Sequence, residues 1–300
     1  MPLLAFCIAL LFAPAGVLPG GLDTLYQNLK DAVANKDAAQ VKKLAAETCA
    51  KAREEAAAKA PEFVEEAEWN KHVAYARDVE AYTEYALYAM AIQGPADVTV
   101  DLTAALEAQN PKSKYLDDAY ATYLVALSQT GAKAKIPAIA EKALANFPNN
   151  EDLLLVLADS AMENRQSDRA LAYAQRLITS LNRAKPEDVP AAAWERKRTA
   201  ALGRGHWIAG MVHCEKGQYL AGDQDLRAAL PLVKGNDAMT GAALFNLGMA
   251  NYQLGKMMQR KSQILEAAKF SEEAAAFKGP YAQQAWHNAQ VMKAEASRMR

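Results

Sequence analysis

Apolar residues recur along this chain at helical spacing, and the pattern restarts after a short break. One apolar stripe follows Asn150, with offsets of three, four and seven residues: Leu154, Leu157, Ala158 and Ala161. Residues 164–167 interrupt it, and a second stripe then begins: Ala170, Leu171, Ala174 and Leu177. The spacing predicts a helix, a tight turn and a second helix in just over thirty residues, and Ser167-Asp168 is expected to cap the second helix.

The same template fits four other segments, so a repeat architecture is expected. The five units, two of them degenerate, are predicted at residues 79–114, 117–150, 151–184, 203–236 and 241–280. Residues 182–198 form an insertion in which Pro186 and Pro190 precede a helix through Trp194. Residues 257–265 lengthen the second helix of the last unit, or the turn before it.

The best local matches are Asn246 to Gly255, which reads NLGMANYQLG, and Lys216 to Tyr219, which reads KGQY. These segments resemble the tetratricopeptide repeat (TPR) family. The resemblance implies an all-α fold, a right-handed α-solenoid of stacked antiparallel helix pairs. Small residues such as Gly210, Gly248 and Ala158 then allow close helix approach. Pro148 and Pro280 stop the second helix of their units.

The segments that flank the repeats are predicted to cover the exposed ends of the solenoid. Residues 21–78 contain amphipathic helices, and Asp37 is placed to cap one of them. Residues 281–300, which include Trp286, are expected to form a C-terminal capping helix.

Residues 1–20 have the features of a signal peptide. They carry no charged side chain, and the apolar run from Leu3 to Phe12 is about half the length of a membrane span. Ala13-Pro14-Ala15 has small residues at a cleavage site, so cleavage is expected after Ala15, with no integral membrane span afterwards. We therefore expect the protein to be exported to a bacterial periplasm or the extracellular space. The alternatives are an envelope anchor through an uncleaved N-terminal helix or through a lipidated Cys7.

The net charge narrows the classes of partner, and the cysteine count bears on disulfide bonding. The formal net charge of -1 gives no electrostatic reason to expect nucleic acid or an acidic membrane surface. Three cysteines cannot form a disulfide framework, and no bond is expected between Cys49 and Cys214.

Catalytic and cofactor motifs are not found in the sequence. It has no GxSxG, P-loop, HExxH or CxxC pattern. His206 and His213 are seven residues apart, about 10 Å along a helix, which is too far to share a metal unaided. With Cys214 they are interpreted as packing residues of a repeat. No enzyme activity, cofactor or metal site is expected.

The TPR resemblance also implies a concave groove lined by the first helix of each pair. Its predicted peptide-binding residues are Leu155, Asp159, Met162, Arg204, Trp207, Met211, Phe245, Met249 and Tyr252, with Asp152 and Cys214 beside them. The apolar character favours a hydrophobic or amphipathic segment as ligand, because Arg204 alone is no clamp for a carboxylate. The alternative is that these residues pack in the core.

The leading functional hypothesis is a non-catalytic scaffold that binds protein or peptide segments and organises envelope complexes. A structural homo-oligomer or spacer is the first alternative, in which self-association fills the groove. A less favoured one is a subunit of an enzyme whose site is not visible in the sequence.

Overall fold

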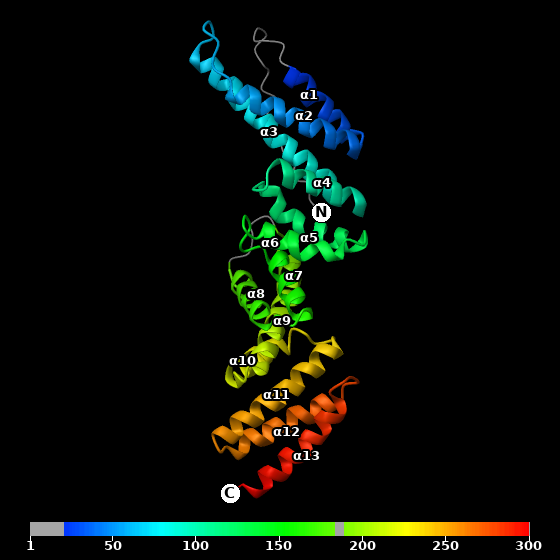
Figure 1. The fold of residues 1–300 in the computed structure, drawn as a ribbon, viewed down its shortest axis with the longest axis vertical. Coiled ribbons are helices and arrows are strands. Elements are labelled where there is room, and N and C mark those ends of the chain that lie inside the picture. The colour runs from blue at the N-terminus through cyan, green and yellow to red at the C-terminus, as the bar shows by residue number, and fades with distance from the viewer. Residues whose placement is uncertain (1–20, 184–188, 300) are drawn as a thin grey trace. The chain divides into compact units, whose positions relative to one another are not determined.

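A computed structural model describes residues 21–183 and 189–299 of the chain (Figure 1). These residues form helices joined by turns, with no β-strand among them, as the periodicity predicts. None of these helices combines the length and the apolar character needed to cross a membrane. The predicted signal peptide, with Cys7 and Ala15, and Pro186 of the predicted insertion lie outside the described residues. The chain divides into two compact units, at residues 119 and 120.

The first unit is built from four helices: α1 (Gly21–Ala34), α2 (Ala38–Ala57), α3 (Glu66–Gln93) and α4 (Ala96–Gln109). Each packs on the next, and α1 also contacts α3. Helix α3 is 28 residues long and runs without a break through residues 78 and 79. The start of the first predicted repeat is therefore no helix boundary. Helix α5 (Lys114–Gln129) begins in this unit and continues into the second.

The described part of the second unit continues with a short 3₁₀ turn at Lys133–Lys135 and then eight helices, of which the first is short. In chain order these are α6 (Ile136–Ala143), α7 (Glu151–Glu163), α8 (Ser167–Leu181), α9 (Ala191–Glu215), α10 (Tyr219–Ala229), α11 (Asp237–Met257), α12 (Lys261–Ala275) and α13 (Ala282–Arg298). From α7 onward each helix packs on the next. Helix α9 also contacts both α7 and α11, so the first helices of successive pairs are neighbours. This sequential packing defines a repeat-like all-helical protein.

Five of the tight turns share one hydrogen-bonded geometry. Each has a residue of positive φ between its two helices: Lys36, Gly131, Arg165, Gly217 and Gln259. The amide that follows this residue donates to the carbonyl five positions earlier, for example Gln218 to His213 at 2.8 Å and Gln166 to Ala161 at 2.8 Å. This is the 6→1 bond of a Schellman motif, which ends a helix and reverses the chain within three residues. The turn between α3 and α4 is different, since Gly94 has a φ of −82°.

Close helix crossings are made at small residues, as expected. A β-carbon on Gly210 would lie 2.6 Å from Leu226 Cγ of α10, and one on Gly248 would lie 2.4 Å from Ser271 Oγ of α12. Ala158 is fully buried and packs with Ala170 and Ala174 of the neighbouring helix. These contacts bring paired helices nearer than larger side chains would allow.

The predicted helix caps are correct in one case and wrong in another. The carboxylate of Asp37 accepts a hydrogen bond from the Gln40 amide at 3.0 Å and caps α2. Ser167 does not cap α8, because the three-residue turn leaves the N-cap position to Gln166. Ser167 is the first helical residue, and its hydroxyl donates to Glu215 at 2.8 Å. Asn150 caps α7 by accepting from the Leu153 amide at 3.0 Å.

The extra residues of the predicted insertion partly lengthen a helix. Residues 191–198 are the first turns of α9, which is 25 residues long. The ammonium group of Lys197 on this extension lies 2.6 Å from Asp152 and 2.7 Å from Glu151 at the start of α7. In the last repeat the turn is confined to residues 258–260, so the added length lies in the 21-residue α11 and not in α12.

Candidate functional site

A cavity of about 450 Å³ opens on the second unit, between the first helices of three successive pairs. Met162 of α7, Met211 of α9 and Met249 of α11 each line it. Phe245, one turn before Met249, completes the apolar surface and stacks on Tyr281 with the ring centroids 4.7 Å apart. Three methionines from successive helix pairs, together with Phe245 and Tyr281, therefore face one space.

Polar side chains also line the cavity. Glu215 and Tyr219 lie at the α9–α10 turn, and Asn246 and Gln253 project from α11. The Glu215 carboxylate accepts a hydrogen bond from Ser167, which holds it at the end of α9. A segment that bound here would meet both apolar side chains and hydrogen-bonding groups.

Met249 is held in place from the C-terminal helix. The side-chain amide of Asn288 on α13 donates to the sulfur of Met249 at 3.3 Å. Ring stacking by Tyr281, directly before α13, fixes Phe245 from the same direction. The C-terminal segment thus orients two of the lining residues in addition to packing on α12.

Cys214 lies at the cavity but is chemically shielded. Its sulfur faces the backbone of α10, where a β-carbon on Gly222 would lie 2.5 Å from it. Burial, and then the carboxylates of Asp223 and Asp225, raise the pKa of this thiol to about 12. At neutral pH the group is a protonated thiol and a poor nucleophile. Cys49 and Cys214 are both unpaired in the described structure.

Of the nine predicted groove residues, four line the cavity: Met162, Met211, Phe245 and Met249. The other five lie outside its lining: Leu155, Asp159, Arg204, Trp207 and Tyr252. Leu155 is half-buried on α7. The Tyr252 hydroxyl is hydrogen-bonded to Glu295 of α13, and the Lys256 ammonium lies 5.2 Å from the centre of its ring.

Arg204, Asp159 and Trp207 form a cluster next to the cavity. The Arg204 Nε donates to Asp159 at 2.6 Å, which joins α9 to α7. The same guanidinium lies 4.8 Å from the centre of the Trp207 ring. The indole of Trp207 donates to the Met239 carbonyl at 3.0 Å, and its ring packs on the buried cluster around Leu226. These side chains connect neighbouring helix pairs. Such packing is the alternative to a groove for the predicted peptide-binding residues.

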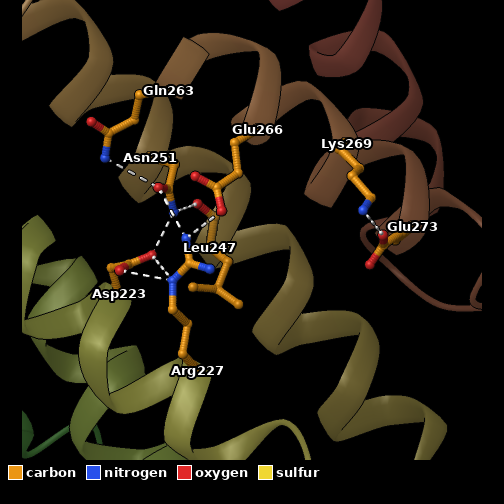
Figure 2. A network of polar contacts seen from close by, with 8 residues as sticks. All are labelled: Asp223, Arg227, Leu247, Asn251, Gln263, Glu266, Lys269 and Glu273. Carbon is orange, nitrogen blue, oxygen red and sulfur yellow. Dashed lines mark hydrogen bonds and ion pairs between the residues drawn. The ribbon is translucent and has the colours of Figure 1, made fainter. Parts of the chain in front are cut away.

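A polar network holds α10, α11 and α12 together beside this region. Figure 2 shows Asn251 of α11 between Asp223 and Arg227 of α10 and Gln263 and Glu266 of α12. The fully buried Asn251 amide donates to Asp223 at 2.6 Å and to the Leu247 carbonyl at 2.9 Å. Arg227 contacts both oxygens of Asp223 and reaches Glu266 at 2.8 Å. One buried amide and one guanidinium therefore connect three successive helices.

The structure brings His206 and His213 to one carboxylate, which sequence spacing did not reveal. Asp225 of α10 lies 2.8 Å from Nδ1 of His206 and 3.6 Å from Nε2 of His213. Nδ1 of His213 is also 2.5 Å from the side-chain oxygen of Gln218. Within residues 21–183 and 189–299, no group of three His, Cys, Asp or Glu side chains is arranged to hold a metal ion.

No protein-family model matches this chain, and a comparison with curated proteins finds no match.

Proposed function

We propose that this chain is a non-catalytic, TPR-like scaffold that binds a protein or peptide segment in the cavity of its second unit. The observation that carries the proposal is the convergence of Met162, Met211 and Met249, from α7, α9 and α11, on one cavity with Phe245. The first helices of stacked pairs line the concave face in TPR-like solenoids. Helices α7, α9 and α11 are the first helices of their pairs.

The TPR-like assignment is supported by the repeated local geometry. Gly210 and Gly248 stand 38 residues apart, and each is at the crossing of a first helix with its partner. The three complete pairs of this unit close on the same hydrogen-bonded turn, at Arg165, Gly217 and Gln259. The right-handed superhelix and the capping roles of the terminal helices are part of the proposal.

The chemistry of the cavity favours a hydrophobic or amphipathic segment. Methionine is unbranched and polarizable, so three of them can adapt to one or two large apolar side chains. A C-terminal carboxylate is a poorer ligand, because the guanidinium of Arg204 is already paired with Asp159. The proposed setting is the bacterial envelope or the extracellular space, where the scaffold organises complexes. Self-association through the same cavity is the alternative.

The cavity can be tested with two matched pairs of methionines. Met211→Gln/Met249→Gln replaces lining residues with polar isosteres, whereas Met257→Gln/Met258→Gln changes methionines that are 74% and 47% exposed. Residues 21–300 of each variant would be used for affinity capture from an envelope extract. We expect a partner that the wild type and the exposed-site variant retain and the cavity variant loses. The same captured proteins for all three would reject the cavity.

Photo-crosslinking locates the contact directly. A photoreactive residue in place of Gln253, which lines the cavity, should crosslink to the captured partner, and one in place of the exposed Gln283 on α13 should not. Crosslinks between two copies of the chain, with mass doubling in sedimentation, would favour the homo-oligomer. Trp207 is a poor choice for this test, because its hydrogen bond to Met239 makes its loss a change in stability.

A further inference from the structure

Six tyrosines in the first unit form a continuous row of rings, here called the tyrosine row. Four of them lie along α3, with spacings of seven, three and three residues, and the other two come from α1 and α5: Tyr75, Tyr82, Tyr85, Tyr88, Tyr26 and Tyr115. The α3 members alone extend over about 20 Å of helix. Figure 1 shows α1 and α3 within the first unit.

The rings contact one another in sequence along the row. The centroid of Tyr26 is 6.4 Å from that of Tyr75 and 5.1 Å from that of Tyr82, both edge to face. Tyr82 is 6.0 Å from Tyr85, which is 5.8 Å from Tyr115. Tyr115 then stacks on Tyr88 at 5.3 Å. Tyr75 and Tyr85 are each 37% exposed and the other four rings are half-buried, so the row lies at the surface.

Carboxylates lie beside several rings of this row. Burial comes first in raising the pKa of Tyr26, Tyr75 and Tyr88, and nearby carboxylates add to it: Asp78 for Tyr26, Asp23 for Tyr75 and Asp118 for Tyr88. The Tyr75 hydroxyl also donates to Asp23 at 2.6 Å. Carboxylates thus flank the row from one end to the other.

The near-neutral total charge conceals a strong division between the two units. Residues 1–119 contain 11 Lys and Arg against 18 Asp and Glu, a net charge of −7. Residues 120–300 contain 23 against 17, a net charge of +6. The unit that carries the tyrosine row is therefore strongly acidic, and its field attracts cations.

Two cations of the unit already lie over rings of the row. The ammonium of Lys30 is 4.7 Å from the centre of Tyr26, and that of Lys114 is 5.1 Å from the centre of Tyr115. The face of an aromatic ring attracts a cation through its quadrupole, and flanking carboxylates strengthen the attraction. Lys30 and Lys114 thus already occupy the kind of position that a partner's cationic side chain would take.

From ring geometry, flanking carboxylates and resident cations, we propose that the tyrosine row is a docking surface for a lysine- or arginine-bearing segment of a partner protein. The partner's cationic side chains lie over tyrosine faces and pair with Asp23 and Asp78 at their edges. The surface belongs to the first unit and shares no residue with the cavity of the second, so either proposal can fail without the other.

The test is a fluorescence anisotropy titration of the full chain with labelled Gly/Ser peptides that carry several arginines, several citrullines or several glutamates. We expect the arginine peptide alone to bind, and to bind more weakly as salt rises from about 50 to about 300 mM. Tyr75→Leu/Tyr85→Leu should weaken binding about tenfold, while Tyr75→Phe/Tyr85→Phe, which keeps the ring faces, should remain within about twofold.

Two charge variants give effects of opposite sign. Asp78→Asn, at an exposed position, should weaken binding of the arginine peptide a few fold. Lys30→Met should strengthen it, because the resident cation no longer competes for Tyr26. Trp286→Leu on α13, which removes an aromatic side chain that is 60% exposed in the other unit, should change nothing. Circular dichroism checks that each variant keeps its helicity.

The outcomes that overturn the proposal are distinct. Equal binding of the arginine and citrulline peptides would exclude the cation–ring interaction as the basis of binding. An equal loss of binding with the leucine and phenylalanine pairs would exclude it too. Concentration-dependent dimerisation that the leucine pair or high salt abolishes would make a second copy the occupant, in place of a different partner.

Discussion

Gly210 of α9 lies against Leu226 of α10 at the crossing of a helix pair, where a β-carbon would come within 2.6 Å of the leucine Cγ and 3.0 Å of its backbone nitrogen. Alanine is the better helix former by about 1 kcal/mol. Overpacking at such a contact costs about 1 to 3 kcal/mol. The crossing therefore selects glycine against the intrinsic preference of the helix.

Gly210→Ala is expected to lower the free energy of unfolding by about 1 kcal/mol, since the steric cost exceeds the gain in propensity. Urea titration followed by circular dichroism measures the change. Gly279→Ala is the matched control, because its β-carbon would meet nothing within 4 Å. A Gly210→Ala protein as stable as the wild type would show that α9 and α10 can separate without penalty.

The positive-φ residue of the repeated turn leads to predicted stability changes of opposite sign for two substitutions. Arg165 has a φ of 56°, which costs a non-glycine residue on the order of 1 kcal/mol, so Arg165→Gly should raise stability by about 0.5 to 1 kcal/mol. Gly131 has a φ of 76° and open space around it, so Gly131→Ala should lower stability by about 1 kcal/mol for conformational reasons alone. Thermal melting of the two variants checks this, and shifts of the same sign would contradict it.

Asn251 is the central group of the polar network in Figure 2. Asn251→Ala leaves a gap and removes the amide that pairs with the Asp223 carboxylate, and we expect a loss of about 2 to 3 kcal/mol. Lys269→Ala is the control from the same picture, because its pair with Glu273 at 3.9 Å is exposed and should contribute less than about 0.5 kcal/mol. Chemical denaturation of both variants separates a buried connector from a surface ion pair.

The tyrosine row predicts a loss of stability in alkali. Burial, and then Tyr26 and Tyr85, raise the pKa of Tyr82 from 10.0 to about 12, so the folded protein holds this proton more tightly than the unfolded chain. Its contribution is complete below pH 10 and is lost as the pH rises through about 12. Tyrosinate absorbance and helicity, titrated together, should show late ionisation followed by unfolding. Tyr82→Phe should unfold at higher pH than the wild type, and an unchanged midpoint would count against this origin.

The order of helices follows from local signals in the sequence. Apolar spacing after Asn150, and glycines at positions such as Gly217, predict the pairs α7–α8 and α9–α10, which the structure contains. Asp37 is recognisable as a cap because capping needs only its own backbone neighbours. The predicted start of the first repeat, at residue 79, lies inside α3, whose apolar pattern continues there without a cap or a turn residue.

The candidate sites depend on angles between helices, which the sequence does not contain. Trp207 and Met211 are one turn apart on α9, yet one is hydrogen-bonded to the Met239 carbonyl and the other lines the cavity. The tyrosine row combines rings from three helices, so the sequence shows only the part of it that lies along α3. His206 and His213 meet at Asp225 only because α10 folds back along α9.

The sequential packing of the second unit also determines how it would respond to a pulling force. Helix α13 has four buried residues, and its main neighbour is α12. A load applied at the two ends of such an array would peel one pair at a time, because each pair is retained chiefly by the next. The unit would then lengthen and shorten in steps, one helix pair at a time, and would not unfold in a single event.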